Sequence, residues 1–289
     1  MKASDVKKVT VLGAGLMGSG IAQVCALAGI NVVMRDIKDE FTQGGLKRIK
    51  DSLEEGVTKG KVKREDVDAT LRRITTTTDL AEAVREADLI IEAIPEDMKL
   101  KKEVYKEVSN NAPEGAIIAS NTSTLSISEM AAYVKNPKNF LGLHFFNPAP
   151  KMKLLEIVKG KMTADETVQF GRDIANRLGK TGVVCTDSPG FIANRVAIPI
   201  QIEAIMALEE GVATKEDIDT AMKLGYNYPM GPLELADLIG LDTVLHSIKG
   251  VGDKLKSPRF KAPKLLEQMV KEGNLGRKTG KGFYDYTKK

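Results

Sequence analysis

The sequence contains few of the residues that most often carry acid–base chemistry or cross-links. Its 289 residues include no tryptophan, two histidines and two cysteines. Cys25 and Cys185 allow at most one disulfide, which excludes a disulfide scaffold and favours a reducing compartment such as the cytoplasm. Chemistry that needs a group titrating near neutral pH therefore has two histidine candidates, His144 and His246.

A strong charge of one sign is also missing. The sequence has 43 lysines and arginines against 39 aspartates and glutamates, a net charge of +4. Spread over this length, that excess is no footprint of a nucleic-acid-binding protein, so no nucleic-acid partner is expected. With 42% apolar and 28% charged residues, a disordered or collagen-like chain is excluded. The length fits one large domain or two smaller ones.

One long stretch, Val9 to Met34, carries no charged residue and follows three lysines within the first eight residues. Such a stretch is typical of a signal peptide or a membrane span. Its glycines, however, are placed in a pattern between two short apolar runs, which favours strand, turn, helix and strand. We therefore expect a soluble protein without a membrane segment.

Short apolar runs alternate with longer amphipathic segments along residues 1–187. The predicted strands are Val9–Leu12, Asn31–Met34, Ile74–Thr76, Leu89–Glu92, Ile117–Ser120, Leu141–Phe145, Leu154–Val158 and Gly182–Cys185. The predicted helices are Gly15–Ala28, Phe41–Lys59, Leu80–Ala87, Met98–Asn110, Ile127–Ala132 and Ala164–Leu178. This alternation predicts an α/β domain with a parallel, doubly wound sheet.

The pattern of apolar residues changes after Asp187-Ser-Pro-Gly190. Runs typical of strands disappear there, and a helical periodicity begins with Phe191–Glu210. Thr214-Lys-Glu-Asp217 is a typical helix start with an acidic first turn. We therefore predict two domains, an α/β domain over 1–187 and an all-helical C-terminal domain over 188–289.

A charged arm, residues 41–73, interrupts the α/β pattern and is predicted to form two helices joined around Gly56–Gly60. It contains nine basic and six acidic residues. Charge alone favours a solvated helical hairpin. The alternative is a basic arm that meets a phosphorylated ligand.

A G-x-G-x-x-G motif, Gly13-Ala-Gly15-Leu16-Met17-Gly18, follows the first predicted strand and opens the first helix. In this context the first glycine allows a tight turn, the second lets a pyrophosphate approach the backbone, and the third lets helix and strand pack closely. The helix N-terminus adds free N–H donors for that phosphate. The motif predicts a Rossmann-type dinucleotide-binding domain.

The cofactor preference depends on the end of the second strand. Asp36 lies there, 18 positions after Gly18, where a carboxylate accepts hydrogen bonds from an adenine ribose 2′-hydroxyl and favours NAD. The neighbouring Arg35 is suited to a 2′-phosphate or to stacking on adenine, which leaves NADP open as well.

The first histidine, His144, lies in an apolar strand, where a histidine is more often a core residue than a catalyst. The segments 141–146 and 153–158 flank a short proline-containing loop. If they pair as an antiparallel hairpin centred near residue 150, His144 lies opposite Glu156. A carboxylate beside an imidazole fixes its tautomer and stabilises its charged form, which suits proton exchange with a substrate hydroxyl. His246 lies in a helical pattern without such a partner and is predicted to be structural.

A polar run, Ser120-Asn-Thr-Ser123-Thr124, follows the apolar strand residues Ile117–Ala119. Ligands of open α/β sheets bind at the carboxyl ends of strands, so Ser123 is a candidate donor to a substrate oxygen. The alternative is an ordinary polar loop or helix cap. The sequence has no spacing typical of a metal site, a P-loop or a Ser–His–Asp triad.

Together these motifs resemble the 3-hydroxyacyl-CoA dehydrogenase family, and the resemblance extends from Val9 to Tyr286. The motifs are Gly13-Ala-Gly-Leu-Met-Gly18, Ile94-Pro-Glu-Asp97, Ser120-Asn-Thr-Ser123, Leu143-His-Phe-Phe-Asn-Pro148, Pro189-Gly-Phe-Ile-Ala-Asn-Arg195 and Gly276-Arg-Lys-Thr-Gly-Lys-Gly-Phe-Tyr284. The length is similar to that of the short-chain members, including the 3-hydroxybutyryl-CoA dehydrogenases, and leaves no room for the hydratase domain of multifunctional members.

The resemblance implies a reversible, NAD-dependent oxidation of (S)-3-hydroxyacyl-CoA, with 3-hydroxybutyryl-CoA as the expected substrate, in a homodimer formed through the helical domain. It implies His144 as general acid and base, Glu156 as its orienting carboxylate, and Ser123 and Asn194 at the substrate oxygen. Besides the glycine motif, the positions that match NAD contacts are Asp36, Glu96, Lys101, Asn147 and Lys278. The positions that match coenzyme A contacts are Ser52 and Lys59, both in the arm.

Two alternatives stay open at this point. A related two-domain dehydrogenase of free β-hydroxy acids would use a lysine base and lack both the His–Glu pair and the basic arm. A non-catalytic protein on the same fold is disfavoured by the intact Ser123, His144, Glu156 and Asn194. Acyl-chain length and pathway, whether fatty-acid oxidation or butanoate metabolism, are not fixed by the sequence.

Overall fold

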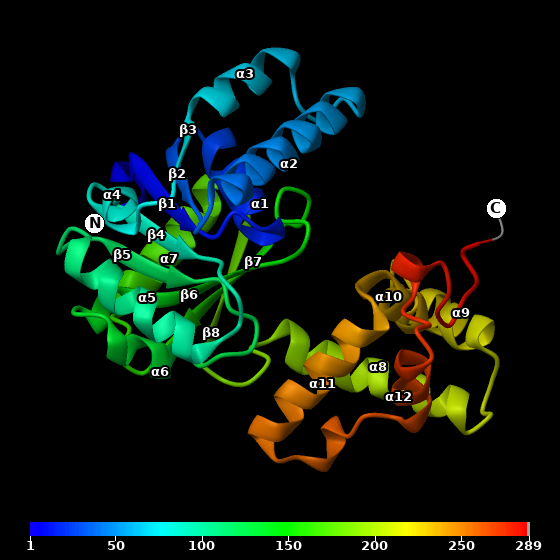
Figure 1. The fold of residues 1–289 in the computed structure, drawn as a ribbon. Helices are drawn as coiled ribbons and strands as arrows, with labels where there is room; N and C mark the ends of the chain where they lie inside the picture. Colours follow the sequence, from blue (N-terminus) through cyan, green and yellow to red (C-terminus); the bar gives the residue numbers. More distant parts are fainter. Residues whose placement is uncertain (288–289) are drawn as a thin grey trace. The chain divides into compact units, whose positions relative to one another are not determined.

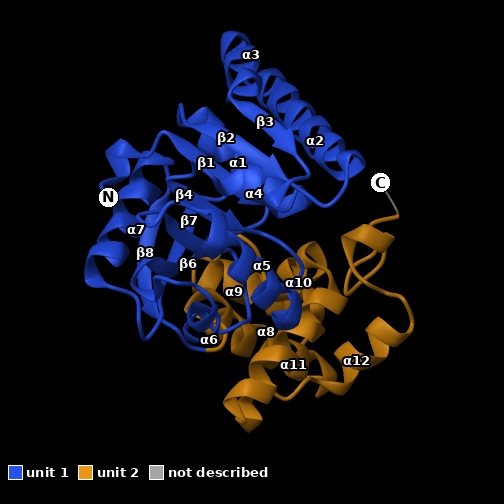
Figure 2. Ribbon diagram, turned by 60° about the vertical axis from the view of Figure 1, so that its left-hand side comes forward, with its two compact units in different colours: residues 1–188 blue, residues 189–289 orange. Residues whose placement is uncertain are grey.

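The computed structural model describes residues 1–287, which form two compact units divided between Ser188 and Pro189 (Figure 2). The first unit is an α/β domain and the second is helical. The uncharged stretch near the N-terminus forms the first strand, first helix and second strand, as predicted. Within residues 1–287, none of the helices combines the length and apolar character needed to cross a bilayer.

The first unit contains one eight-stranded sheet in the order β3-β2-β1-β4-β5-β6-β7-β8 (Figure 1). Its strands are β1 (Lys8–Leu12), β2 (Asn31–Arg35), β3 (Ile74–Thr77), β4 (Leu89–Glu92), β5 (Ile117–Ser120), β6 (Phe140–Phe145), β7 (Leu154–Lys159) and β8 (Thr181–Thr186). Every neighbouring pair is parallel except β6 and β7, which are antiparallel. The predicted α/β class with a doubly wound sheet is confirmed.

The helices of the first unit connect these strands. They are α1 (Leu16–Leu27), α2 (Asp39–Thr58), α3 (Arg64–Arg72), α4 (Leu80–Val84), α5 (Met98–Asn111), α6 (Ile127–Met130) and α7 (Asp165–Arg177). The arm forms two helices, as predicted, but their connection spans residues 59–63, so it begins later than the predicted junction Gly56–Gly60, and Gly56 belongs to α2. A side chain at Gly56 would collide with Val62 of the returning chain, so this glycine allows close packing rather than a turn.

Successive side chains along each strand point to opposite faces of the sheet, so the apolar core and the polar strand ends lie on different faces. Residues at every second position, such as Val9 and Val11 in β1 or Leu141 and Leu143 in β6, form one buried apolar cluster with α1, α2 and α7. Full burial of such a side chain contributes about 1.5–3 kcal/mol, so the strand register is strongly fixed. The opposite face is covered by α5 and α6, and there the strand ends carry polar side chains.

The second unit consists of α8 (Ala193–Glu209), α9 (Lys215–Gly225), α10 (Pro232–Ile239), α11 (Leu241–Leu255) and α12 (Lys264–Lys271). Its core is apolar and includes Ile202 and Ile205 of α8 and Val244 and Ile248 of α11. The predicted helix over Phe191–Glu210 begins later than expected, because Gly190 and Phe191 both adopt positive φ and cannot belong to the helix.

Buried carboxylates attach the C-terminal segment to this helical core. Asp237 of α10 is fully buried and accepts hydrogen bonds from the backbone N–H groups of Phe283 (2.9 Å) and Tyr284 (2.9 Å) and from the Tyr286 hydroxyl (3.1 Å). The buried Asp219 accepts a further hydrogen bond from the Tyr284 hydroxyl (2.8 Å). The chain after the short 3₁₀ helix 277–279 is therefore held by two carboxylates that have no solvent to replace their donors.

We predict that Asp237→Asn lowers the free energy of unfolding by about 1–3 kcal/mol, because an amide group presents N–H to some of the same donors. Denaturant titration followed by circular dichroism measures this. Asp253→Asn, at an exposed position of α11, is the matched control and should leave stability nearly unchanged. Equal stability of Asp237→Asn and the wild type would contradict the prediction.

Candidate active site

The glycine motif forms the turn between β1 and α1, and each glycine meets a different constraint. Gly13 has φ +102°, a conformation that favours glycine, and its Cα faces the Ala93 carbonyl. A side chain at Gly18 would collide with the Gly13 carbonyl oxygen, so helix and turn pack tightly there. A Cβ at Gly15 would meet no atom within 4 Å, so the backbone is open at that residue.

Open backbone at Gly15 coincides with the start of α1. Helix α1 begins at Leu16 and continues through Met17, and the first N–H groups of a helix have no intrahelical acceptor. Together with the positive end of the helix dipole, they fit a diphosphate group. The residues present therefore fit the diphosphate part of a dinucleotide cofactor.

The end of β2 places a carboxylate beside this turn. The Asp36 carboxylate accepts hydrogen bonds from the N–H groups of Ala14 (2.7 Å) and Ile37 (2.7 Å), one on each oxygen. Each oxygen keeps a lone pair for a further donor such as a ribose hydroxyl. The Arg35 Nε instead donates to the Thr78 carbonyl (3.1 Å), beyond β3. The acidic group, rather than the guanidinium, thus bonds the glycine turn.

Antiparallel pairing of β6 and β7 places His144 directly opposite Glu156, which confirms the predicted hairpin. His144 Nδ1 lies 2.7 Å from Glu156 Oε2, and His144 Nε2 lies 3.0 Å from Ser123 Oγ. Glu156 is fully buried and His144 is 4% exposed. The structure therefore joins the three residues in one hydrogen-bonded chain.

Hydrogen bonding defines the proton positions in this chain. An ionised Glu156 only accepts, so His144 Nδ1 donates to it and Nε2 of the neutral ring is an acceptor. The Ser123 hydroxyl then donates to Nε2. Such an imidazole is ready to take a proton at Nε2, and the buried carboxylate stabilises the charge that results.

The loop that carries Ser123 is held by Glu96. Its carboxylate accepts hydrogen bonds from the Ser123 N–H (2.7 Å) and the Thr122 hydroxyl (2.8 Å). Glu96 matched an NAD-contacting position in the sequence. The structure shows a bond to the serine loop, and the contact with the cofactor stays a prediction.

A second acidic residue, Glu92 at the end of β4, was missed by sequence reasoning. It is fully buried, and its carboxylate accepts hydrogen bonds from Lys101 (2.6 Å), Tyr105 (2.6 Å), Ser120 (2.7 Å) and the Ile94 N–H (2.8 Å). Burial and the Glu92 carboxylate raise the pKa of Tyr105 well above its usual range. The sequence signal that could have revealed it is the single charged residue, Glu92, directly after the apolar run Leu89–Ile91.

This contact changes how Lys101 is understood. Its side chain is 1% exposed, and its ammonium group pairs with Glu92 at 2.6 Å and lies 3.5 Å from Glu96. In this structure Lys101 thus supports the loop 93–97 from inside, and its predicted contact with NAD is untested.

The predicted coenzyme A residue Ser52 lines a groove of about 340 Å³ between α1, α2 and the segment 147–151. Asn147, a predicted NAD contact, lines the same groove. Lys59, at the end of α2, forms an ion pair with Glu55. The arm 41–73 is therefore a wall of a groove in the first unit rather than a free hairpin.

The remaining predicted residues lie in the second unit. Asn194 is in the first turn of α8, and Lys278 forms an ion pair with Asp242 (2.5 Å). His246 lies exposed on α11.

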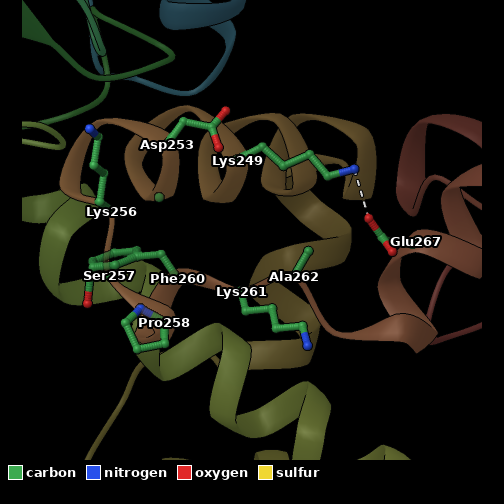
Figure 3. A pocket seen from close by; sticks show the side chains of 10 residues that line it. Lys249, Asp253, Lys256, Ser257, Pro258, Phe260, Lys261, Ala262 and Glu267 are labelled. Carbon is green, nitrogen blue, oxygen red and sulfur yellow. Dashed lines mark ion pairs between the residues drawn. The ribbon is translucent and has the colours of Figure 1, made fainter.

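A separate pocket of about 550 Å³ lies at the end of α11, where Lys249 pairs with Glu267 (Figure 3). None of the predicted site residues lines it.

Neither cysteine belongs to this chemistry. Cys25 is buried and Cys185 half-buried, and both are free thiols. Burial raises the pKa of each thiol to about 12, so both are protonated near neutral pH and poor nucleophiles.

A dinucleotide-binding turn and a Ser–His–Glu chain on one sheet define a class, the oxidoreductases that move a proton alongside a hydride. Comparison with known proteins agrees. The family description "3-hydroxyacyl-CoA dehydrogenase, NAD binding domain" matches residues 8–188, and "3-hydroxyacyl-CoA dehydrogenase, C-terminal domain" matches residues 190–286. The chain belongs to the 3-hydroxyacyl-CoA dehydrogenase family. The expected enzyme class and NAD as cofactor are thereby confirmed.

Individual relatives match over nearly their whole length. A probable 3-hydroxybutyryl-CoA dehydrogenase of Bacillus subtilis is 46% identical over 285 residues, covering 99% of both chains. The mitochondrial hydroxyacyl-coenzyme A dehydrogenase of Homo sapiens is 45% identical, covering 97% of this chain and 91% of its own. Among solved structures, the (S)-3-hydroxybutyryl-CoA dehydrogenase of Ralstonia eutropha has a TM-score of 0.92 at 42% identity, covering 98% of this chain and 100% of its own.

We predict that Gly15→Ala weakens NADH binding by about tenfold, the equivalent of one lost hydrogen bond, while leaving stability nearly unchanged. The added methyl group meets no protein atom but occupies the space above the open backbone. Fluorescence titration with NADH measures the affinity, and thermal unfolding measures the stability. Gly18→Ala is the contrasting variant and should lower stability instead. Wild-type NADH affinity in Gly15→Ala would contradict the prediction.

Proposed function

We propose that this enzyme catalyses the reversible NAD-dependent oxidation of short-chain (S)-3-hydroxyacyl-CoA, such as 3-hydroxybutyryl-CoA, to 3-oxoacyl-CoA. The observation that carries the proposal is the hydrogen-bonded chain Ser123–His144–Glu156, whose histidine and glutamate are buried, at one end of the β6–β7 hairpin. The names of the Bacillus subtilis and Ralstonia eutropha relatives support the four-carbon substrate.

In the proposed mechanism His144 Nε2 takes the proton of the substrate 3-hydroxyl, and Glu156 stabilises the imidazolium that forms. When the substrate binds, the Ser123 hydroxyl exchanges its hydrogen bond to Nε2 for one to the same oxygen, and it orients that oxygen toward the imidazole. Bound NAD, held by the glycine turn and Asp36, would supply the hydride acceptor for C3 and, in the reverse direction, the hydride donor. For reduction, the His144 imidazolium gives the proton back to the 3-oxygen. Asn194 is proposed to assist at this oxygen.

The proposed cofactor residues divide into two groups. The glycine turn and Asp36 would hold the diphosphate and the adenine ribose. Glu96, Asn147 and Lys278 are proposed to contact the rest of NAD, and Lys101 to support them from its buried position. Ser52 and Lys59 are proposed to contact the coenzyme A part of the substrate.

The direct test of this function is NADH oxidation at 340 nm with acetoacetyl-CoA, compared with free acetoacetate. Turnover of the thioester alone supports the proposal. Turnover of the free acid alone would favour a dehydrogenase of free hydroxy acids, and no turnover of either would favour a non-catalytic protein. A panel of four- to sixteen-carbon thioesters with NADH and NADPH defines chain length and cofactor preference.

We predict that His144→Ala lowers kcat by about 10²–10⁴-fold, the usual contribution of a general acid or base, with unchanged NADH affinity. Glu156→Gln should lower kcat less, because the amide can still orient the ring but cannot neutralise its charge. Steady-state kinetics and NADH titration of both variants measure this. Near-wild-type turnover of His144→Ala would remove the histidine from the mechanism.

We further propose a cytoplasmic homodimer formed through the helical unit. Large apolar side chains exposed on that unit support an interface, including Leu224 (82% exposed), Tyr226 (73%) and Leu238 (50%). The free thiols support a reducing compartment. Light scattering distinguishes a monomer of 31.4 kDa from a particle of twice that mass.

A further inference from the structure

The groove of the first unit is lined by a lysine, Lys151, that belongs to none of the sequence motifs. The segment 147–151, which follows β6, lies against α1, because a Cβ on Gly20 would approach Ala149 and Pro150 at 3.2 and 3.3 Å. Its last residue, Lys151, lines the groove opposite Ser52 and Glu55 of α2.

Lys151 and Lys59 converge on one carboxylate. Lys151 Nζ lies 3.0 Å from Glu55 Oε1, and Lys59 Nζ bonds the same oxygen atom. The two lysine side chains are 53% and 55% exposed, so both ammonium groups remain accessible from solvent. The two hydrogen bonds lower the pKa of Glu55 to about 2, which keeps its carboxylate charged near neutral pH. The cluster therefore carries two positive charges and one negative charge.

We infer that Lys151 is a second phosphate-binding residue of this groove, acting together with Lys59 on the phosphorylated nucleotide end of an acyl-CoA. This inference rests on the proposed function. A phosphate group offers several anionic oxygens and more charge than one carboxylate, so it is a better acceptor for two neighbouring ammonium groups. Glu55 would then act as an internal counter-ion that holds the two lysines together until the ligand replaces it.

The lining of the groove agrees with this role. It includes Asn147, two residues after the end of β6 and three after His144, as well as Glu55 and Lys151. A ligand with a reactive acyl group at one end and phosphates at the other can therefore place the acyl group near β6 and the phosphates at the lysines. Arg48 and Asp51 also line the groove, and their charges offset each other.

A simpler role is that the cluster only attaches α2 to the segment 147–151. Half-exposed ion pairs contribute little to stability because water screens them. A role in attachment would affect thermal unfolding and all substrates equally, whereas a role in phosphate binding would affect only ligands that carry phosphate.

The experiment compares Lys151→Met with the wild type, using acetoacetyl-CoA and its phosphate-free analogue acetoacetyl-N-acetylcysteamine. We expect the KM for acetoacetyl-CoA to rise about three- to fivefold, as for a solvent-screened charge contact, with kcat and the KM for NADH unchanged. The kcat/KM for the phosphate-free thioester should not change. Increasing salt should shrink the difference between variant and wild type. Glu55→Gln should lower the KM for acetoacetyl-CoA, since it removes the competing carboxylate.

Lys153→Met is the matched control, because Lys153 is exposed two residues further on and does not line the groove. Equal losses for both thioesters, or a raised KM for NADH instead, would overturn the inference.

Calorimetric titration with coenzyme A, 3′-dephospho-coenzyme A and pantetheine tests the inference without turnover. If wild-type enzyme does not reduce acetoacetyl-CoA, the proposed function fails. The coenzyme A affinities of wild type and Lys151→Met then still decide the role of Lys151.

Discussion

The pairing of β6 with β7 is the constraint on which the site depends. It is the one antiparallel pair in the sheet of the first unit, and its register sets His144 against Glu156. Both side chains are buried, and a buried charge or imidazole without a partner is costly. A slip of one residue would turn Glu156 into the apolar cluster beneath the sheet. The core and the site therefore stabilise the same register.

Much of this arrangement follows from local patterns. All eight predicted strands are present. Most are apolar runs, as expected for strands covered by helices, whereas β3 is largely threonine, a residue that favours strands. The His144–Glu156 contact was predicted because the register of a hairpin follows from where it turns. The contacts of Glu92 with Ser120 and of Glu55 with Lys151 join residues 28 and 96 positions apart. Nothing in the local sequence specifies such contacts. The first depends on the parallel pairing of β4 with β5, and the second on how α2 packs against the segment 147–151.

The two faces of the sheet have different roles. One face is apolar and packs against α1, α2 and α7, and it fixes where each strand ends. The other face presents polar groups at those ends, where Ser123, His144 and Glu156 meet. Strand alternation thus allows a tightly packed core and a polar site within one sheet, without a charged residue entering the apolar cluster. The glycine turn lies at the carboxyl end of β1, the edge at which open sheets bind ligands.

The buried Glu92 carboxylate has a consequence for the energetics of catalysis. It ties α5, the loop 93–97 and the end of β5 together before any ligand arrives, and Glu96 then holds the Ser123 loop. The hydroxyl and imidazole are consequently preorganised. In the proposed mechanism, the conformational entropy of ordering this loop is lost during folding rather than at substrate binding, so more of the binding free energy is available to orient the reacting hydroxyl.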